Sequence, residues 1–256
     1  MRLDSGGIYK FKFIIVGDKA VGKSSIVRRF VENKFTLDYR STLGLNVLSH
    51  SLSFYGNEVY FSLWDVGAQE YFKRFRKTYY IGAQAAFIVF DVCERDSFAN
   101  VKVWYKELEV FLDKKNIPIV IVGNKIDLAD QRSVEYKEGI ALVEELTKEN
   151  SETHFSYIET SALTGENVED AFSLIAYHYI MKSKEREEQK LKESLMDQIN
   201  SLLNKKGKLT ISFITENPYW SPGLQILNEV NILCECEKLL DDKEKRLYNY
   251  SNGLVI

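Results

Sequence analysis

The segment Gly17-Asp18-Lys19-Ala20-Val21-Gly22-Lys23-Ser24 directly follows an apolar run, Phe11 to Val16. Its spacing fits the pattern G-x-x-x-x-G-K-[ST], in which backbone N–H groups of a glycine-containing loop wrap around phosphate oxygens. Lys23 supplies a positive charge, and Ser24 supplies a hydroxyl group that can bind Mg²⁺. The pattern requires a strand before the loop and a helix after it, and the sequence meets both conditions. The segment therefore predicts a phosphate-binding loop and a bound nucleoside phosphate.

A second polar motif, Gly123-Asn124-Lys125-Ile126-Asp127, follows the apolar run Ile117 to Val122. Ligands of open α/β sheets bind at the carboxyl ends of strands, so both motifs are expected near one edge. The Asp127 carboxylate can accept hydrogen bonds from N1–H and the exocyclic amine of guanine, whereas adenine presents the wrong pattern. Taken singly, each motif can also be an ordinary turn. The two motifs together favour a guanine nucleotide site.

Five sequence boxes resemble, in order, those of the small GTPases of the Ras superfamily, and the likeness covers roughly residues 8 to 182. The boxes are Gly17 to Ser24, Ser41-Thr42-Leu43-Gly44, Trp64-Asp65-Val66-Gly67-Ala68-Gln69, Gly123 to Asp127, and Thr160-Ser161-Ala162. Segments 79–86 and 159–168 resemble Rab proteins, whereas segments 42–47 and 64–67 resemble the Arf branch. The chain is therefore identified as Rab-like overall, with Arf-like features in the switch boxes.

The resemblance implies Mg²⁺ as the cofactor and GTP or GDP as the ligand. It implies that Gln69 orients the attacking water, with Lys23 and Thr42 completing the catalytic set. Ser24 and Thr42 are implied to bind the metal directly, and Asp65 through water. The implied phosphate contacts are Asp18, Lys19, Ala20, Val21, Gly22, Lys23, Ser24, Ser25, Thr42 and Ala68. The implied guanine contacts are Phe35, Asn124, Lys125, Asp127, Ser161, Ala162 and Leu163.

The resemblance also implies three kinds of protein partner, namely effectors, exchange factors and GTPase-activating proteins. They are expected to bind at the switches, around Thr42, Val47, Trp64 and Tyr79. Rab relatives use an aromatic trio to bind effectors, and Val47 replaces its third member here. The usual set of Rab partners is therefore in doubt for this chain.

Besides Val47, Ala68 and Lys19 depart from the pattern of the family. Ala68 replaces a glycine whose N–H meets the γ-phosphate, and its methyl group restricts the backbone. Either switching is stiffened by this methyl group, or the neighbouring Gly67 serves as the hinge. Lys19 stands where many relatives have a small residue. It is expected either to hinder a partner's arginine finger or to point into solvent.

The composition limits the classes of partner and location. The 256 residues are 45% hydrophobic and carry a net charge of −3, so the chain can bury a core but has no basic excess for nucleic acid. Three cysteines suit a reducing compartment, and no apolar run approaches the length of a membrane span. We expect a cytoplasmic location. Without a prenylation or myristoylation signal, membrane contact is expected only through partners.

The alternation of apolar runs predicts an α/β P-loop small-GTPase fold. It has a mostly parallel six-stranded sheet with one antiparallel edge strand and helices on both faces. Strands are expected at 11–16, 48–54, 59–63, 85–92, 117–123 and 155–159, with a hairpin turn at Gly56-Asn57. Helices are expected at 96–112, 134–148 and 168–182, and switch loops at 35–45 and 67–81.

The chain is predicted to contain two domains, a small GTPase (G) domain at residues 1–182 and a C-terminal extension at 183–256. Apolar residues recur at helical spacing from Leu191 to Leu202, a short strand is expected at 209–213, and a helix is expected after Ser221-Pro222. Such a helix-strand-helix unit is too small to bury much surface alone. We expect it to dock on the G domain, on a second copy or on a partner.

The sequence is compatible with three functions. The leading hypothesis is a guanine-nucleotide-dependent switch that binds Mg-GTP, hydrolyses it slowly and presents its switches to effectors in trafficking or signalling. The alternative is a GTP-binding scaffold with little hydrolysis, because Ala68 replaces the switch glycine. A nucleotide kinase would also use the phosphate loop, but it does not explain the motif from Asn124 to Asp127.

Overall fold

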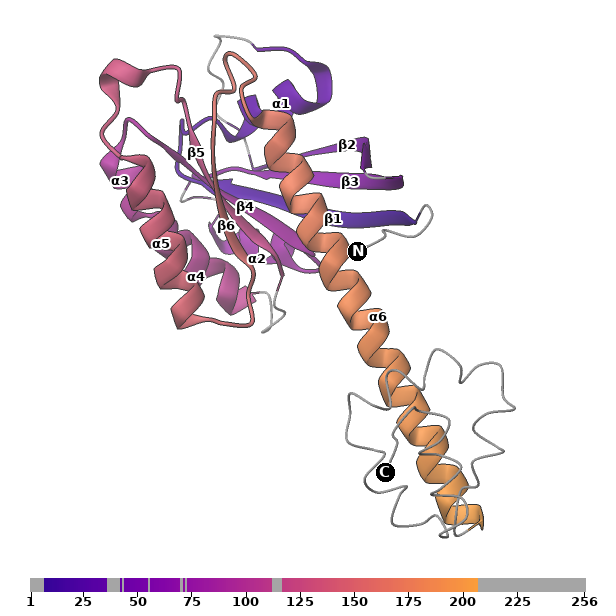
Figure 1. Cartoon of the computed structure of the whole chain (residues 1–256). Helices are drawn as coiled ribbons and strands as arrows, with labels where there is room; N and C mark the ends of the chain where they lie inside the picture. The colour runs from indigo at the N-terminus through magenta and orange to yellow at the C-terminus, as the bar shows by residue number, and fades with distance from the viewer. Residues whose placement is uncertain are drawn as a thin grey trace, which may run out of the picture. The chain divides into compact units, whose positions relative to one another are not determined.

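The computed structural model describes residues 7–35, 42, 44–54, 56–69, 71, 73–111 and 117–206. Six strands form one sheet in the order β2-β3-β1-β4-β5-β6 (Figure 1). The strands are β1 (Ile8–Gly17), β2 (Leu45–Phe54), β3 (Asn57–Val66), β4 (Ala85–Asp91), β5 (Ile119–Asn124) and β6 (Phe155–Thr160). Only the β2–β3 pair is antiparallel, and β2 lies at the edge of the sheet. The predicted fold class is confirmed.

In the described part of the chain, six α-helices and a short 3₁₀ helix lie between these strands or after the last of them. They are α1 (Lys23–Glu32), α2 (Lys73–Tyr80), α3 (Arg95–Ala99), α4 (Val101–Phe111), η2 (Ala129–Gln131), α5 (Tyr136–Glu149) and α6 (Val168–Lys206). The sheet and its covering helices belong to a compact unit of residues 1–183. Of residues 184–256, the structure describes 184–206, which are helical. The strand expected at 209–213 and the helix expected after Ser221 lie outside the described residues.

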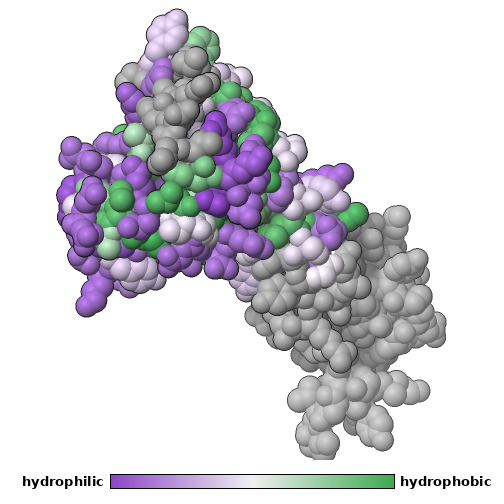
Figure 2. Space-filling model, turned by 90° about the horizontal axis from the view of Figure 1, so that it is seen from above, coloured by the Kyte–Doolittle hydropathy of each residue, from purple (hydrophilic) through white to green (hydrophobic). Residues whose placement is uncertain are grey.

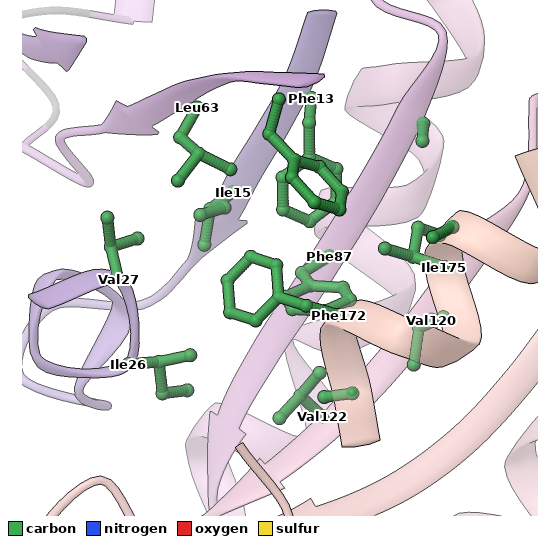
Figure 3. Packing of buried hydrophobic residues seen from close by; sticks show 14 of the residues in the cluster. Phe13, Ile15, Ile26, Val27, Leu63, Phe87, Val120, Val122, Phe172 and Ile175 are labelled. Atoms are coloured by element: carbon green, nitrogen blue, oxygen red, sulfur yellow. The ribbon is translucent and has the colours of Figure 1, made fainter. Parts of the chain in front are cut away.

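The core has two layers, one on each face of the sheet, because successive strand residues point to opposite sides. In β1, Phe13 and Ile15 belong to the first cluster, whereas Ile14 and Val16 belong to the second. The first cluster lies beneath α1 and α6, where Phe172 meets residues of β1, β3 and β4 (Figure 3). The second cluster packs against α4 and α5. Double-sided burial explains why β4 and β5 are continuously apolar rather than alternating.

The structure corrects three of the expected boundaries. Helix α2 lies inside the segment expected to be a loop from Gly67 to Ile81. Its buried face includes Arg76, so the apolar periodicity that would reveal the helix is interrupted by a charged residue. The helix expected at 96–112 divides at Asn100, whose backbone ends α3 and begins α4. Helix α6 continues to Lys206 rather than ending at Lys182.

Gly139 in α5 provides a test of the packing on the second face. A Cβ atom at this buried glycine would lie 2.2 Å from Cζ of Tyr157. The Tyr157 ring is held because its hydroxyl donates to Glu159 at 2.8 Å, and its ring stacks at 6.2 Å from that of Phe90. Gly139→Ala should therefore cost about 1–2 kcal/mol of unfolding free energy, although alanine favours helices. Urea unfolding of the purified protein measures this loss.

The control for this prediction is the same change in a Tyr157→Leu background. Shortening Tyr157 removes the ring atoms that the new methyl group meets. There Gly139→Ala should be neutral, or should stabilise by up to about 1 kcal/mol through helix propensity. Equal losses in both backgrounds would contradict the proposed contact.

Candidate nucleotide-binding site

The phosphate loop connects the end of β1 at Gly17 to the start of α1 at Lys23. Two of its glycines have positive φ angles, 138° at Gly17 and 98° at Gly22. A Cβ atom at Gly17 would lie 2.1 Å from the carbonyl oxygen of Val89 in β4. Only glycine allows the backbone of residue 17 to lie this close to Val89. This close packing places the start of α1 beside the carboxyl end of the sheet. Backbone N–H groups at a helix N-terminus favour a bound anion.

Lys23 is buried within the phosphate loop. Its Nζ donates to the carbonyl oxygens of Gly17 and Asp18 at 2.8 and 2.6 Å, and these bonds hold its side chain across the loop. Burial lowers the pKa of Lys23 to about 8, and the nearby Asp65 and Asp18 carboxylates partly oppose this shift. A phosphate anion beside the ammonium group would stabilise its charged form. The buried lysine therefore fits an anionic ligand.

Two hydroxyl groups and one carboxylate meet beside this loop. The Oγ of Ser24 lies 2.8 Å from Oγ1 of Thr42 and also donates to Oδ2 of Asp65. Asp65 is 1% exposed, its Oδ1 has no hydrogen-bond partner among the described residues, and burial raises the pKa of the carboxyl group. An unpaired buried carboxylate oxygen beside two hydroxyl groups fits a hard, oxygen-preferring cation such as Mg²⁺.

The described part of the chain holds no cluster of three or more histidine, cysteine, aspartate or glutamate side chains that could bind a metal. The set of Ser24, Thr42 and Asp65 is the candidate metal site because its oxygen atoms converge beside an unpaired carboxylate oxygen. Mg²⁺ needs few protein carboxylates when substrate phosphates and water complete its coordination. The sequence placed these three residues together, although Thr42 lies 18 residues from Ser24 along the chain.

Asn124 joins the phosphate loop to the neighbouring motif after β6. Its Nδ2 donates to the carbonyl oxygen of Val21 at 2.9 Å. Its Oδ1 accepts from Oγ1 of Thr160 at 3.1 Å and from the backbone N–H of Ala162 at 3.2 Å. The side chain is 1% exposed. The sequence predicted Asn124 as a guanine contact, and in the structure it also ties three loops together.

Two charged or polar side chains flank the expected place of the base. The Oγ of Ser161 donates to Oδ1 of Asp127 at 2.5 Å, which fixes the carboxylate. The Nζ of Lys125 lies 2.5 Å from Oδ2 of Asp91, and Lys125 has a positive φ of 72°. Asp127 and Lys125, two predicted guanine contacts that follow β5, are thus held by partners at the carboxyl ends of β6 and β4.

Arg29 on α1 is a further part of this region that the sequence reasoning missed. Its Nε donates to the carbonyl oxygen of Ala162 at 3.0 Å, and its Nη2 donates to that of Leu163 at 2.5 Å. These bonds fix the loop that carries three of the predicted guanine contacts, Ser161, Ala162 and Leu163. A lone arginine on a helix carries no local signal for contacts more than 130 residues away.

The other predicted site residues lie in different surroundings. Lys19 and Ala20 are exposed, which fits both expectations for Lys19, contact with a partner's arginine finger and a position in solvent. Phe35 packs against the first core cluster. The Asp18 carboxylate accepts from Nδ2 of Asn100 and Nε1 of Trp104, both at 2.7 Å, so this side chain faces α4.

Ala68 and Gly67 differ in how closely they pack. The backbone N–H of Gly67 donates to the carbonyl oxygen of Gly44 at 2.8 Å, and a Cβ atom at Gly67 would lie 2.7 Å from the carbonyl oxygen of Thr42. Ala68 is half-buried, packs against the second core cluster, and is not among the residues with positive φ. In this conformation the methyl group of Ala68 is accommodated, whereas Gly67 must be glycine.

Comparisons with known proteins agree with this geometry. A sequence model of the Ras family matches residues 12–181. The Ras-related protein Rab2BV of Beta vulgaris is 40% identical over 184 residues, which cover 71% of this chain and 82% of the relative. RABA2b of Arabidopsis thaliana shows the same identity and coverage. The GTP-binding protein ypt3 of Schizosaccharomyces pombe is 37% identical over 167 residues, covering 65% of this chain and 74% of the relative.

The residues matched by the Ras family model include the phosphate loop, the Ser24-Thr42-Asp65 set and the loops joined by Asn124. No helix in the described part of the chain is long and apolar enough to cross a membrane. The chain belongs to the Ras family, as a Rab-like small GTPase of the Ras superfamily.

Proposed function

We propose that this protein is a guanine-nucleotide switch that binds Mg-GTP, hydrolyses it slowly, and presents its switch segments to effectors. The observation that carries the proposal is the unpaired Oδ1 of Asp65 beside the hydroxyl groups of Ser24 and Thr42. Thr42 and Asp65 lie in separate segments of the chain, and both meet Ser24 next to the phosphate loop. A group that binds all three residues would therefore link both segments to the phosphates.

The residues have distinct roles in this proposal. Lys23 and the N–H groups of the phosphate loop hold the phosphate oxygens, while Ser24 and Thr42 bind Mg²⁺ directly and Asp65 holds it through water. Bound Mg²⁺ would neutralise the charge that develops on the phosphates. Gln69 orients the attacking water, and Asp127 selects guanine. Intrinsic turnover is expected on the order of 10⁻⁴ to 10⁻³ s⁻¹, with an external protein accelerating it.

The alternative is a GTP-binding scaffold that hardly hydrolyses its ligand. It rests on Ala68, whose methyl group replaces a glycine of the family. The structure gives one reason to favour the switch, since Ala68 adopts an ordinary backbone conformation and Gly67 makes the close contacts. Switching requires the backbone of these segments to adopt two states, whereas hydrolysis requires a positioned water, so a hydrolysis measurement distinguishes the two functions.

Single-turnover hydrolysis of GTP with Mg²⁺ separates the two functions. The purified protein should contain guanine nucleotide, and wild type should hydrolyse GTP at the slow rate given above. Gln69→Leu should lower that rate at least about tenfold, because leucine cannot orient water. Its affinity for GTP should stay within about threefold of wild type, since Gln69 acts on the water rather than on the nucleotide.

Ala68→Gly is the companion variant, and it restores the glycine of the family. If the switch assignment holds, this variant should hydrolyse GTP within about threefold of the wild-type rate. Bound GTP without turnover in wild type, rescued by Ala68→Gly, would instead establish the scaffold. Unchanged hydrolysis in Gln69→Leu would contradict the role given to Gln69.

We further propose that partner proteins bind around the switches, through Thr42, Val47, Trp64 and Tyr79. Large apolar side chains are exposed near these positions, with Val47 46%, Phe75 44% and Tyr71 70% exposed. Apolar residues reach the surface in patches between hydrophilic ones on the face seen in Figure 2. Exposed aromatic and aliphatic groups of this kind suit effectors, exchange factors and GTPase-activating proteins.

The cellular role and location are inferred from the similarity to Rab proteins. The Rab-named relatives favour membrane trafficking, with this protein in the cytoplasm and reaching membranes through its partners. We propose a division into a G domain at residues 1–182 and an interaction element at residues 183–256. The exposed Leu191 on α6 gives this element one apolar contact point.

A further inference from the structure

Among the residues that the structure describes, Arg76 of α2 is the most buried charged side chain outside the nucleotide site, and the proposed reaction does not use it. Its side chain is 2% exposed. Its Nε and Nη2 donate to Oε1 and Oε2 of Glu107 at 2.7 and 2.8 Å, and Oε1 also accepts from Tyr80. The guanidinium lies 4.7 Å from the centre of the Trp104 ring. A bidentate pair stacked on an aromatic ring has a single well-defined geometry.

This arrangement gives no clear gain in stability. Removing two charges from water costs several kcal/mol per ion, and apolar residues of similar volume are often equally stable at such sites. A buried pair can instead fix the register between two elements. Here the elements are α2, which begins close after Gln69, and α4. The pair therefore fixes how the segment that carries Gln69 lies against α4.

The same arginine also reaches the segment before Gln69. Nη1 of Arg76 donates to the carbonyl oxygen of Ala68 at 3.5 Å, a long hydrogen bond. That carbonyl belongs to the peptide unit that leads into Gln69. Any rotation of this peptide unit changes the distance to Arg76 as well as the direction of the Gln69 side chain. The position of Arg76 and the orientation of Gln69 are thus linked through one peptide.

The phosphate loop is attached to the same face of α4. Nε1 of Trp104 and Nδ2 of Asn100 each donate to one oxygen of the Asp18 carboxylate, both at 2.7 Å. Asn100, Trp104 and Glu107 follow one another at spacings of four and three residues, so they line one side of the helix. One helical face therefore holds the phosphate loop through Asp18 and the Gln69 segment through Arg76.

We propose that Arg76, Trp104 and Glu107 form a bridge between the phosphate loop and the Ala68–Gln69 segment, and that Arg76 is a positioning residue for Gln69 in GTP hydrolysis. The inference rests on the proposed switch function and extends it to residues that do not touch the nucleotide. Trp104 lies at the centre of the bridge, between the Arg76 guanidinium and the Asp18 carboxylate. Its indole ring therefore senses changes at either loop.

The first measurement is the fluorescence of Trp104. The chain has three tryptophans, and the double variant Trp64→Phe/Trp220→Phe leaves Trp104 as the only one. In this parent protein, emission should differ between complexes with Mg-GDP and with a non-hydrolysable Mg-GTP analogue. Identical emission in the two complexes would overturn the bridge. This measurement needs no change at Arg76 and does not depend on hydrolysis.

The second measurement removes the ion pair with Arg76→Met/Glu107→Gln in the same parent. Methionine keeps the length of the chain, and glutamine keeps an acceptor for Tyr80 without leaving a buried charge unpaired. The variant should hydrolyse GTP at least about tenfold more slowly, keep its GDP affinity within about threefold, and lose the difference in Trp104 emission. Hydrolysis at the parent rate, an equal fall in GDP affinity, or a retained emission difference would each overturn the proposal.

The matched control is Arg95→Met/Glu138→Gln, at a bidentate pair between α3 and α5 with distances of 2.7 and 2.8 Å. This pair is exposed, with side chains 54% and 36% accessible, and its other contacts among the described residues are with Ser133, Glu135 and Phe98, away from the phosphate loop and Ala68. The control should keep both the hydrolysis rate and the Trp104 response. A parent protein that binds GTP but never hydrolyses it would refute the proposed function, while the emission comparison would still test the bridge.

Discussion

Replacing Asp127 with asparagine is expected to weaken GDP binding by about 10⁴-fold, because the site loses the acceptor pair that matches guanine. A carboxylate only accepts hydrogen bonds, whereas an amide presents one acceptor and one donor group. In the structure, Oδ1 of Asp127 already accepts from Ser161 at 2.5 Å. The asparagine oxygen should keep that partner, which directs its NH₂ group at the base. There it would face the exocyclic amine of guanine, donor against donor.

The same reasoning predicts which base the variant prefers. Xanthine carries a carbonyl oxygen where guanine has the exocyclic amine, so the amide NH₂ can donate to it. Asp127→Asn should bind xanthosine diphosphate more tightly than GDP, whereas wild type should show the opposite order. Competition against a fluorescent nucleotide measures both affinities.

Asp130→Asn is the control for this change, since Asp130 is exposed on the 3₁₀ helix η2 and lies outside the predicted guanine contacts. It removes the same charge a few residues away and should leave both affinities unchanged. If Asp127→Asn bound GDP as tightly as wild type does, Asp127 would not be the residue that selects guanine.

The sequence predicted the sheet well because its signals are local. Continuous apolar runs marked β1, β4 and β5, and the alternation around Gly56-Asn57 marked the β2–β3 hairpin. Its strands are longer than expected and pair from Leu45–Val66 to Phe54–Asn57, so Asn57 belongs to β3 rather than to the turn. The phosphate loop was equally clear, because its glycines are required by close backbone approaches that other residues cannot make.

The sequence predicted less where distant side chains define the structure. Helix α2 was missed because Arg76 occupies a buried position that an apolar residue would normally mark. The partner of Arg76 on α4 lies 31 residues away, and no local pattern connects the two. Asp18 was expected to contact phosphate, but only the folded structure shows its carboxylate bound by Asn100 and Trp104. Periodicity reports which face is buried, whereas these contacts depend on tertiary packing.

Gly22→Ala is expected to produce the other large effect, a loss of nucleotide affinity of about 10²-fold or more together with lower stability. Gly22 has a φ of 98°, which alanine rarely adopts, and a Cβ atom there would lie 2.1 Å from Nδ2 of Asn124. The conformational strain alone costs about 1–3 kcal/mol. Displacing Asn124 would also break its bonds to Val21, Thr160 and Ala162. The phosphate loop and the base loops would then lose their common anchor.

Two control variants separate the steric clash with Asn124 from the conformational strain of a positive φ angle. Gly82→Ala introduces alanine at a φ of 76° with no atom within 4 Å of its Cβ, so it should lower stability without affecting nucleotide affinity. In a background of Asn124→Ala, the clashing amide is absent, and Gly22→Ala should lower affinity much less than it does in wild type. Isothermal titration with GDP and thermal unfolding of each variant give both quantities. Additive losses of affinity in the double variant would show that the two residues act separately, and the anchor assigned to Asn124 would then be wrong.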